Sequence, residues 1–455
     1  RQRVESSSHM VADAPREEPV RQLSRSKIEA AHKQRDLSID LRIWAIVSSP
    51  WARHELGFPK GLKFIRKHQE EFDFLNKEIH LYWERIRQPD WEYRCKIEFK
   101  NEMEKLLKEY LKRPLRLVIT GSTVTGVGTA NSDADICLCS PGILHPIARD
   151  ISHDGITLML NKDEKRRRIG LLLRHCKKAL AKADHLGLTK IQFVDAQIPL
   201  LKMEGRRVDK ETGNTFIIDA DLSVSNEVFI SGLHNSHLIK GYTKIDARFA
   251  PLVTFIKKWA VVAGVKDPQI RRFNSYAITL LTIHFLQCGL PRPVLPNLQG
   301  LYPYFYALDE NNHPDRVDLN EELPEPLPDP GLPQIGLSVA ELFYLFVSYY
   351  STIDLRTSVI RVKCGRVSTR GTKERGEHID SDENVCYPPD YAAKSEVFIE
   401  DPIDEHNPGR TVDDWEMVRV CFSSTALIFD RMDNEESAMR FVFPNINLLT
   451  GTVDE

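Results

Sequence analysis

Long apolar runs, paired cysteine motifs and an excess of charge of either sign are all missing from this 455-residue sequence. The 62 Lys and Arg nearly balance the 65 Asp and Glu, for a formal charge of −3. That balance excludes a histone-like polycation, which binds phosphate through excess positive charge. It does not exclude an enzyme with a local basic groove. No apolar stretch is long enough to span a bilayer, so we expect no membrane partner.

The eight cysteines are scattered, without CxxC spacing. This argues against a zinc site and a disulfide framework, and it favours reduced thiols and a cytoplasmic location. Residues 1–20 lack the apolar core of a secretory signal. Ser8-His9-Met10 resembles a cloning remnant, so we expect residues 1–40 to be a tag remnant and a mobile leader.

Hydrophobic periodicity divides the rest of the chain into a mixed unit and a helical unit. It predicts a helical segment over 64–111, a basic helix over 162–186 and mainly helices after Ser236, including a hairpin near 339–350. It predicts strands at 115–119, 134–138, 190–194, 198–203 and 216–224, with a charged turn at 204–214. Stretches 309–333 and 365–394 read as an acidic loop and a polar segment, and there is no internal repeat.

The predicted fold class is therefore α+β: a small mixed-sheet domain and a larger, mainly helical domain with a cleft between them. We expect a helical N-terminal segment at 41–111 that packs on the helical domain. The mixed-sheet domain is expected at 112–242 and the helical domain at 243–455.

The strongest chemical signal is a set of carboxylates near a Gly-Ser turn. Gly121-Ser122 follows a predicted strand and could present a hydroxyl and backbone amides to a phosphate. Asp133 and Asp135 lie two residues apart on a strand, so both side chains leave the same face. Each feature alone is more often a surface turn. Asp221, late in a strand that could pair beside them, supplies a third carboxylate, and three carboxylates can hold two metal ions.

In this combination the sequence resembles the DNA polymerase β-like nucleotidyltransferases. Segments downstream narrow the resemblance to template-independent RNA terminal nucleotidyltransferases, which include terminal uridylyltransferases and cytoplasmic poly(A) polymerases. These segments are Asn235-Ser236, 242–248, 257–260 and 274–277, and the resemblance covers roughly residues 65–435. It implies a nucleotidyltransferase domain followed by a poly(A)-polymerase-associated domain.

The resemblance also implies roles for individual residues. Asp133, Asp135 and Asp221 would be the catalytic, metal-binding carboxylates for two Mg²⁺ (or Mn²⁺) ions, and Asp221 would help to deprotonate the RNA 3′-hydroxyl. The implied nucleotide contacts are Gly121, Ser122, Lys257 and Ser275 near the triphosphate, Asn235 and Ser236 at the ribose, and Tyr276 stacked on the base.

The sequence departs from the family in one basic position. The family often has a second lysine four residues after the first, where this chain has Val261. A lysine there would share a helix face with Lys257. Lys258 points about 100° away around the helix and does not replace it. One phosphate contact is therefore missing or supplied from elsewhere.

The choice of nucleotide depends on a loop near the C-terminus. In the family's uridylyltransferases a histidine at the position of His406 contacts uracil, and Asp401 could orient the base through water. We therefore predict a uridylyltransferase that adds UMP from UTP to RNA 3′ ends, with a poly(A) polymerase using ATP as the alternative. A lone loop histidine could equally be solvated.

Two other classes remain open. An inactive RNA-binding scaffold would typically have lost one metal carboxylate, and all three are present here. A small-molecule nucleotidyltransferase would not predict the long helical domain. The basic segment 162–182 could bind RNA phosphates or be a solvated helix face. No RNA-recognition motif is present, so an RNA-binding protein partner could supply specificity.

Overall fold

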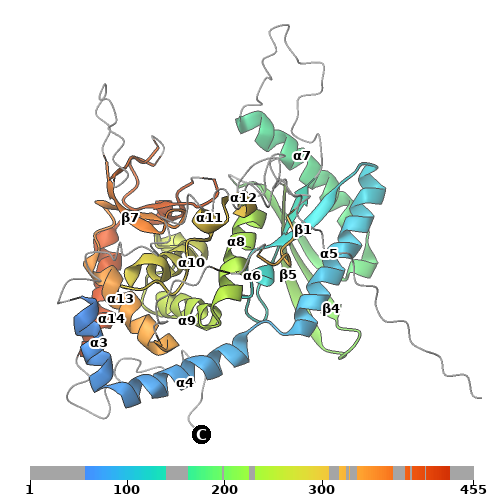
Figure 1. The fold of residues 1–455 in the computed structure, drawn as a ribbon. Helices are drawn as coiled ribbons and strands as arrows, with labels where there is room; N and C mark the ends of the chain where they lie inside the picture. Colours follow the sequence, from blue (N-terminus) through green and yellow to red (C-terminus); the bar gives the residue numbers. More distant parts are fainter. Residues whose placement is uncertain are drawn as a thin grey trace, which may run out of the picture.

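The computed structural model describes residues 57–139, 162–196, 199–224, 231–306, 317–323, 327, 336–371, 385–389, 392–404 and 406–430. The expected leader at 1–40 lies outside these ranges. Element labels follow Figure 1, in which the described elements form two lobes with helix α8 (Ser231–Ile245) between them.

Three helices form the N-terminal part, where the sequence predicts one helical segment. They are α3 (Phe58–Lys67), α4 (Gln69–Ile86) and α5 (Asp90–Leu111). Pro89 occupies the N-cap position of α5. Proline has no backbone N–H to continue the hydrogen bonding of α4, so it separates the two helices. Helix α5 ends at Lys112, which adopts a left-handed conformation two residues before Pro114.

A five-stranded mixed sheet forms the first lobe, with strand order β1-β2-β5-β4-β3. Strands β1 and β2 are antiparallel, β2 and β5 are parallel, and β5, β4 and β3 are antiparallel in turn. The strands are β1 (Arg116–Thr120), β2 (Ala134–Cys139), β3 (Leu188–Val194), β4 (Leu200–Val208) and β5 (Thr215–Val224). The expected strand pairing beside the Asp133 strand is confirmed. The charged turn predicted at 204–214 is too long, because β4 continues to Val208 and only 209–214 turns.

Alternation along the strands explains why the sheet has a buried and an exposed face. In β5 the apolar residues Phe216, Ile218, Ala220 and Leu222 are buried, whereas the intervening residues are not. Helices α5 and α7 (Lys162–Leu180) share one core with the buried face. Short helical turns complete the lobe: α6 (Ser122–Thr125) and a 3₁₀ turn at Asp184–Leu186.

The second lobe is mainly helical, as predicted. Its central helix α10 (Ser275–His284) is buried all round and continues into a π-helical turn at Phe285–Gly289. Around it lie α9 (Phe249–Val262), a 3₁₀ turn at Pro268–Ile270, α11 (Leu298–Leu301), α12 (Pro303–Tyr306), α13 (Val339–Thr352) and α14 (Trp415–Asp430). A capping box between Ser338 and Glu341 begins α13.

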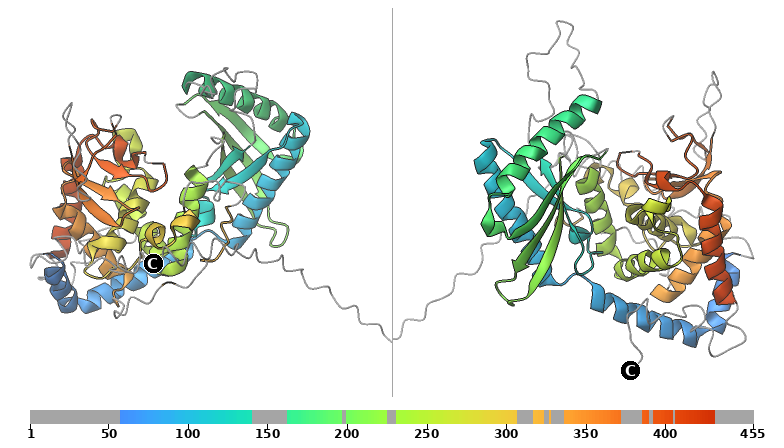
Figure 2. Two further views of the ribbon diagram at one scale, coloured as in Figure 1. Left: turned by 45° about the horizontal axis from the view of Figure 1, so that its top comes forward. Right: turned by 180° about the vertical axis from the view of Figure 1, so that it is seen from behind.

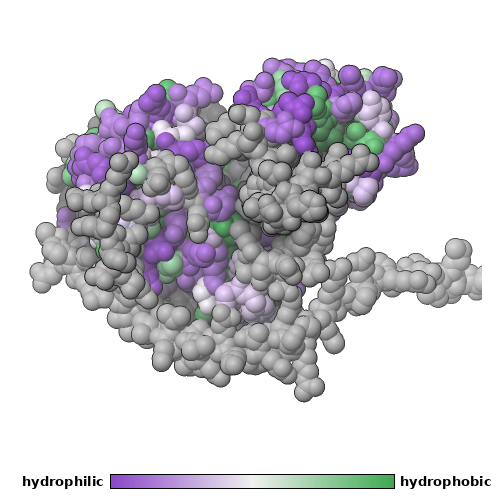
Figure 3. Space-filling view, turned by 90° about the horizontal axis from the view of Figure 1, so that it is seen from above, coloured by the Kyte–Doolittle hydropathy of each residue, from purple (hydrophilic) through white to green (hydrophobic). Residues whose placement is uncertain are grey.

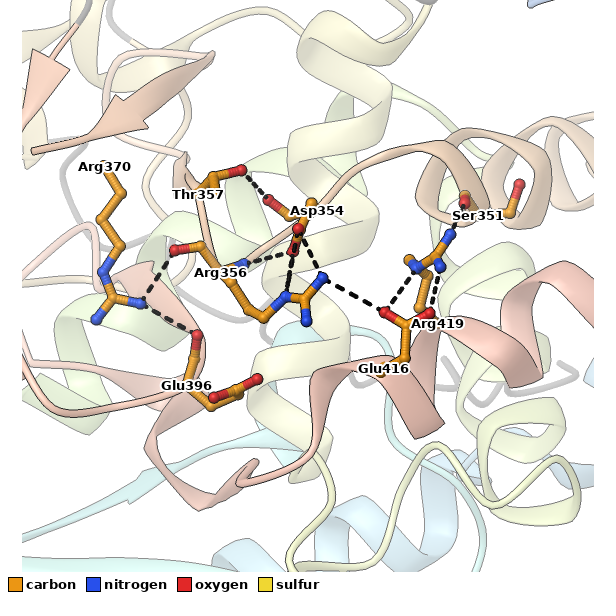
Figure 4. Close-up of polar contacts among 8 residues, drawn as sticks. All are labelled: Ser351, Asp354, Arg356, Thr357, Arg370, Glu396, Glu416 and Arg419. Atoms are coloured by element: carbon orange, nitrogen blue, oxygen red, sulfur yellow. Dashed lines mark hydrogen bonds and ion pairs between the residues drawn. The ribbon is translucent and has the colours of Figure 1, made fainter.

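The helical lobe also carries a four-stranded sheet that the sequence did not predict. Its order is β8-β7-β6-β9, formed by β6 (Ser358–Arg361), β7 (Arg366–Arg370), β8 (Val385–Cys386) and β9 (Phe398–Glu400). The predicted hairpin near 339–350 is wrong, because α13 is one helix and packs against the distant α14. An ion-paired network joins the start of β6 to α14: Arg356 binds Asp354 through two nitrogens and also reaches Glu416 (Figure 4).

The two lobes have separate hydrophobic cores, and the N-terminal helices are divided between them. Helices α3 and α4 pack with the helical lobe through Ile65, Phe72, Leu75 and Ile79. Helix α5 instead belongs to the sheet core through Phe99 and Met103. The chain crosses between the lobes along α4 (Figures 1 and 2). We propose that the domain boundary lies near Pro89 rather than at Leu111.

Candidate active site

The Gly-Ser turn lies at the end of β1, where the sequence predicts it. Gly121 has φ of +72°, which favours glycine, and a Cβ there would lie 2.3 Å from Asp135 Oδ2. Its amide donates a hydrogen bond to Ser236 Oγ at 2.8 Å, and Ser236 donates in turn to the carbonyl of Gly232 at 2.6 Å. Helix α8 therefore holds the turn, and the Ser236 hydroxyl is engaged within the protein.

Two of the predicted carboxylates are direct neighbours across the sheet. Asp135 on β2 is paired in register with Asp221 on the parallel strand β5. Paired residues of adjacent strands project from the same face, and the flanking residues Ala134 and Ala220 point into the core. Asp133 immediately precedes β2 and repels Asp135 electrostatically. The structure thus brings all three predicted carboxylates to one edge of the sheet.

The electrostatics of this edge suit a divalent cation. The carboxylate of Asp135 is crowded against Gly121, and burial, followed by repulsion from Asp221 and Asp133, raises its pKa to about 6. Opposed carboxylates of this kind gain stability when a cation neutralises them. Within the described ranges, no group of three or more His, Cys, Asp or Glu residues is arranged to hold a metal ion on its own. Mg²⁺ accepts one or two carboxylates plus water and phosphate oxygens, so the donors present fit it.

Lys202 is a site neighbour that the sequence analysis missed. It lies opposite Asp221 in the β4–β5 register, and its Nζ is 3.4 Å from Asp221 Oδ2. It also lowers the pKa of Asp135, although this effect is smaller than the effects that raise it. Only strand register reveals this contact, because Lys202 belongs to no recognisable motif.

A buried ion pair supports the loop that leads into the carboxylates. Lys96 and Glu92, one turn apart on α5, are 0% and 1% exposed, and Lys96 Nζ is 2.7 Å from Glu92 Oε1. Lys96 also donates to the carbonyl of Ser132 at 2.6 Å, and Glu92 accepts from the amide of Asn131 at 3.0 Å. Asn131 has a positive φ of 58°. The pair therefore fixes the backbone immediately before Asp133.

The helical lobe supplies the residues predicted to contact the nucleotide. Lys257 lies on α9, and burial, with repulsion from Lys266 as a second cause, lowers its pKa to about 8. Ser275 is the first residue of α10, whose N-terminus is capped by the Asn274 side chain at 2.8 Å from the amide of Ala277.

Tyr276, Asn235 and Asp401 lie together, although they come from three distant parts of the chain. Burial, and then the charge of Asp401, raises the pKa of Tyr276 well above its usual value. A hydrogen bond with Asn235 has the opposite, smaller effect and lowers this pKa. Tyr276 interacts with the side chains of Asp401 and Asn235, and Asn235 Oδ1 is buried with no hydrogen-bond partner among the described residues. Buried polar atoms without partners are what a polar ligand would complete.

The predicted base-recognition loop follows β9. Asp401 is 2% exposed, accepts hydrogen bonds from the amides of Ile403 and Asp404, and has a pKa raised by burial. The Asp401 amide donates to the carbonyl of His406 at 2.9 Å, which closes the loop. The His406 ring is 42% exposed, with Nδ1 3.7 Å from Asp404 and Nε2 facing Arg410.

Four arginines of the basic segment 162–182 contact other groups of the protein. Glu164 binds both Arg167 and Arg168, Arg166 binds Asp195, and Arg174 stacks over Phe193. Figure 3 shows mostly hydrophilic residues over the described surface of this lobe, with hydrophobic ones among them. These pairs favour the interpretation of a solvated helix face over that of an RNA groove.

The described part of the acidic loop contacts α8. Lys244 binds Glu322 and Lys240 binds Asn320, beside a cavity of about 330 Å³ that His237 and Tyr306 also line. This cavity is on the opposite side of α8 from Asn235, and so it is separate from the site.

Comparison with known proteins agrees with this geometry. Residues 75–244 match the family model described as poly(A) RNA polymerase, mitochondrial-like, central palm domain. Over this region the chain is similar to the template-independent RNA terminal nucleotidyltransferases. The matched region contains the Gly-Ser turn, all three carboxylates and Asn235-Ser236.

Two curated relatives within this family are poly(A) RNA polymerases. The chain is 28% identical to gld-2 homolog B of Drosophila melanogaster over 79% of this chain and 24% of that protein. It is 28% identical to GLD2-A of Xenopus laevis over 70% of this chain and 51% of that protein. The chain therefore spans about half or less of the length of these relatives.

Solved structures of family members share the fold. The Cid1 poly(U) polymerase with MgGTP has a TM-score of 0.53 and 21% identity, over 81% of this chain and 98% of Cid1. The GLD-2/RNP-8 complex gives 0.55 and 22%, over 84% of this chain and 98% of the matched chain. The predicted fold class is confirmed. No helix in the described ranges is both long and apolar enough to cross a membrane.

Proposed function

We propose that this chain transfers single ribonucleotides to RNA 3′ ends without a template, and that it prefers UTP. The observation that carries this proposal is the in-register pair Asp135 and Asp221 beside the Gly121 turn. A pair of neighbouring, mutually repelling carboxylates that can bind metal ions suits nucleotidyl transfer. A catalytically weak scaffold is disfavoured, because a protein without catalytic activity would have no need for carboxylates that repel one another.

Asp133, Asp135 and Asp221 would hold two Mg²⁺ (or Mn²⁺) ions. When bound, the ions supply Lewis acidity at the α-phosphate and make the RNA 3′-hydroxyl a better nucleophile. Asp221 would help to remove the hydroxyl proton, and Lys257 would neutralise the triphosphate as pyrophosphate leaves. Tyr276 would stack against the base, which gives affinity for any base without selecting one.

Selection of the base is proposed to depend on His406 and Asp401. His406 lies on the loop that closes over Asp401, and Asp401 is next to Tyr276. Support comes from the structures of the Cid1 poly(U) polymerase, which concern UTP selectivity and include a histidine-to-asparagine variant bound to MgATP. The curated relatives are named poly(A) polymerases, and so ATP is the second candidate.

Extension of a short labelled RNA with each of the four NTPs separately tests the proposal. We expect UTP to be incorporated in preference to ATP. His406→Asn should reduce the ratio of UTP to ATP incorporation by about tenfold, because one base-edge hydrogen bond is worth about 1–3 kcal/mol. Asp404→Asn is the matched control, because it changes the partner of the ring and leaves the ring in place. Preferential use of ATP by the unaltered chain would make it a poly(A) polymerase.

The partner and location follow only as proposals. We propose a protein partner that binds RNA, by analogy with the GLD-2/RNP-8 complex, and because three arginines of the basic helix α7 form ion pairs within the protein. A cytoplasmic location is proposed because the eight cysteines are unpaired.

A further inference from the structure

Lys257 and Lys266 form a pair of neighbouring cations in the helical lobe. Burial lowers the pKa of both lysines. The charge of Lys266 also repels the charge of Lys257, and this repulsion contributes to the lowered pKa of Lys257. No salt bridge within the described ranges reaches either lysine. The chain neighbour Asp267 raises the pKa of Lys266, but this effect is smaller than the lowering caused by burial.

The backbone fixes Lys266 in this place. Its amide donates to the carbonyl of Ala260 at 2.8 Å, three residues after Lys257 on α9. Residues three apart share a helix face, so Lys266 is held beside the turn that carries Lys257. Lys266 also forms a parallel bridge with Phe273, two residues before Ser275. Lys266 thus lies between two elements that supply predicted phosphate contacts.

Two like charges kept together and partly out of water cost free energy unless an anion joins them. A protein gains nothing in folding from such an arrangement, which therefore indicates a ligand. Val261, where a second lysine would share the face of Lys257, is 51% exposed and carries no charge. The loop after α9 supplies the charge that position 261 lacks.

We propose that Lys266 is a second phosphate-binding residue, which binds the triphosphate of the incoming nucleotide together with Lys257. The identity of the ligand as a nucleoside triphosphate rests on the proposed function. The inference of a binding site for a polyphosphate anion depends only on the two lysines and their geometry.

Calorimetric binding of inorganic tripolyphosphate to the full chain tests this binding site without turnover. Lys266→Gln should weaken binding by about tenfold or more, since a charge-assisted contact is lost. Lys266→Arg should retain most of the affinity. Lys258→Gln, which removes a charge from another face of α9, should change affinity less than twofold. Equal affinity of Lys266→Gln and the unaltered chain, or no binding to the unaltered chain at millimolar tripolyphosphate, would overturn the proposal.

Two further measurements distinguish an effect of Lys266→Gln on folding from an effect on nucleotide binding. Lys266→Gln should melt no lower than the unaltered chain, because the substitution removes a repulsion. In RNA extension it should raise KM for the nucleotide about tenfold with a smaller effect on kcat. If RNA is extended and KM does not change, the inference fails while the proposed function stands. If RNA is not extended but tripolyphosphate binding depends on Lys266, the binding site stands while the proposed function fails.

Discussion

The buried pair Glu92–Lys96 provides the sharpest test of how the scaffold supports the carboxylates. Lys96→Met removes the ammonium group and keeps most of the side-chain volume. Glu92 is then left 1% exposed without its cation, although it keeps the amide of Asn131. An uncompensated buried charge of this kind costs about 3–5 kcal/mol. The carbonyl of Ser132 also loses its donor.

The expected loss can be read as a shift in thermal unfolding. For a domain of roughly 150–250 residues, 1 kcal/mol lowers Tm by about 2–4 °C, so Lys96→Met should lower Tm of the sheet lobe by roughly 10 °C. Activity should fall as well, because the loop before Asp133 loses its support. Differential scanning calorimetry of the full chain would separate this transition from that of the helical lobe.

Two controls make the result specific. The double variant Glu92→Gln, Lys96→Met leaves no buried charge and should recover part of the lost stability. Arg87→Gln removes a half-exposed ion pair with Glu84, and such pairs contribute about 0–1 kcal/mol. A single Lys96→Met variant that melts within 1 °C of the unaltered chain would refute the assignment of Glu92 as a charged, buried partner.

Two further substitutions test the carboxylate edge. The pKa of Asp135 is raised above its unfolded value, so ionisation of Asp135 destabilises the fold as the pH rises through about 6. Asp135→Asn should therefore abolish RNA extension yet, in EDTA at pH 7.5, melt no lower than the unaltered chain. The gap between them should close by pH 4, and a lower Tm for Asp135→Asn at pH 7.5 would contradict this sign. Gly121→Ala combines an unfavourable φ with a contact at 2.3 Å, so it should cost at least about 1–2 kcal/mol and reduce kcat. Gly213→Ala, at a similar φ with open space around it, is the matched control for backbone strain, and equal effects of the two would assign no role to the Asp135 contact.

The sequence predicts the sheet lobe well because its strands alternate between apolar and polar residues. The alternation in β5 placed Asp219 and Asp221 on one face, and the structure agrees. The second sheet escaped prediction because its strands are two to five residues long, and because β9 pairs with β6 from a segment distant in the chain.

Parts of the site were hidden for a different reason. A glutamate and a lysine four residues apart on a helix usually form a solvated pair. Nothing local distinguishes Glu92 and Lys96 from such a pair, because their burial depends on packing between α5 and the loop near Ser132. Lys202 was missed because only register places it opposite Asp221.

The charge balance of the sequence acquires a physical meaning from the pairs in the structure. Some of the concentrated charge is neutralised locally: three arginines of α7 by Glu164 and Asp195, and Lys244 of α8 by Glu322. Among the described residues, two groups have pKa values shifted against the charged form: Asp135 beside the other carboxylates of the β2–β5 edge, and the lysines Lys257 and Lys266 beside α9 and α10. A metal-bound triphosphate has the complementary arrangement, with cations for the first group and anionic oxygens for the second. The electrostatic cost of both groups is therefore expected to be relieved together, by a single ligand that joins the two lobes.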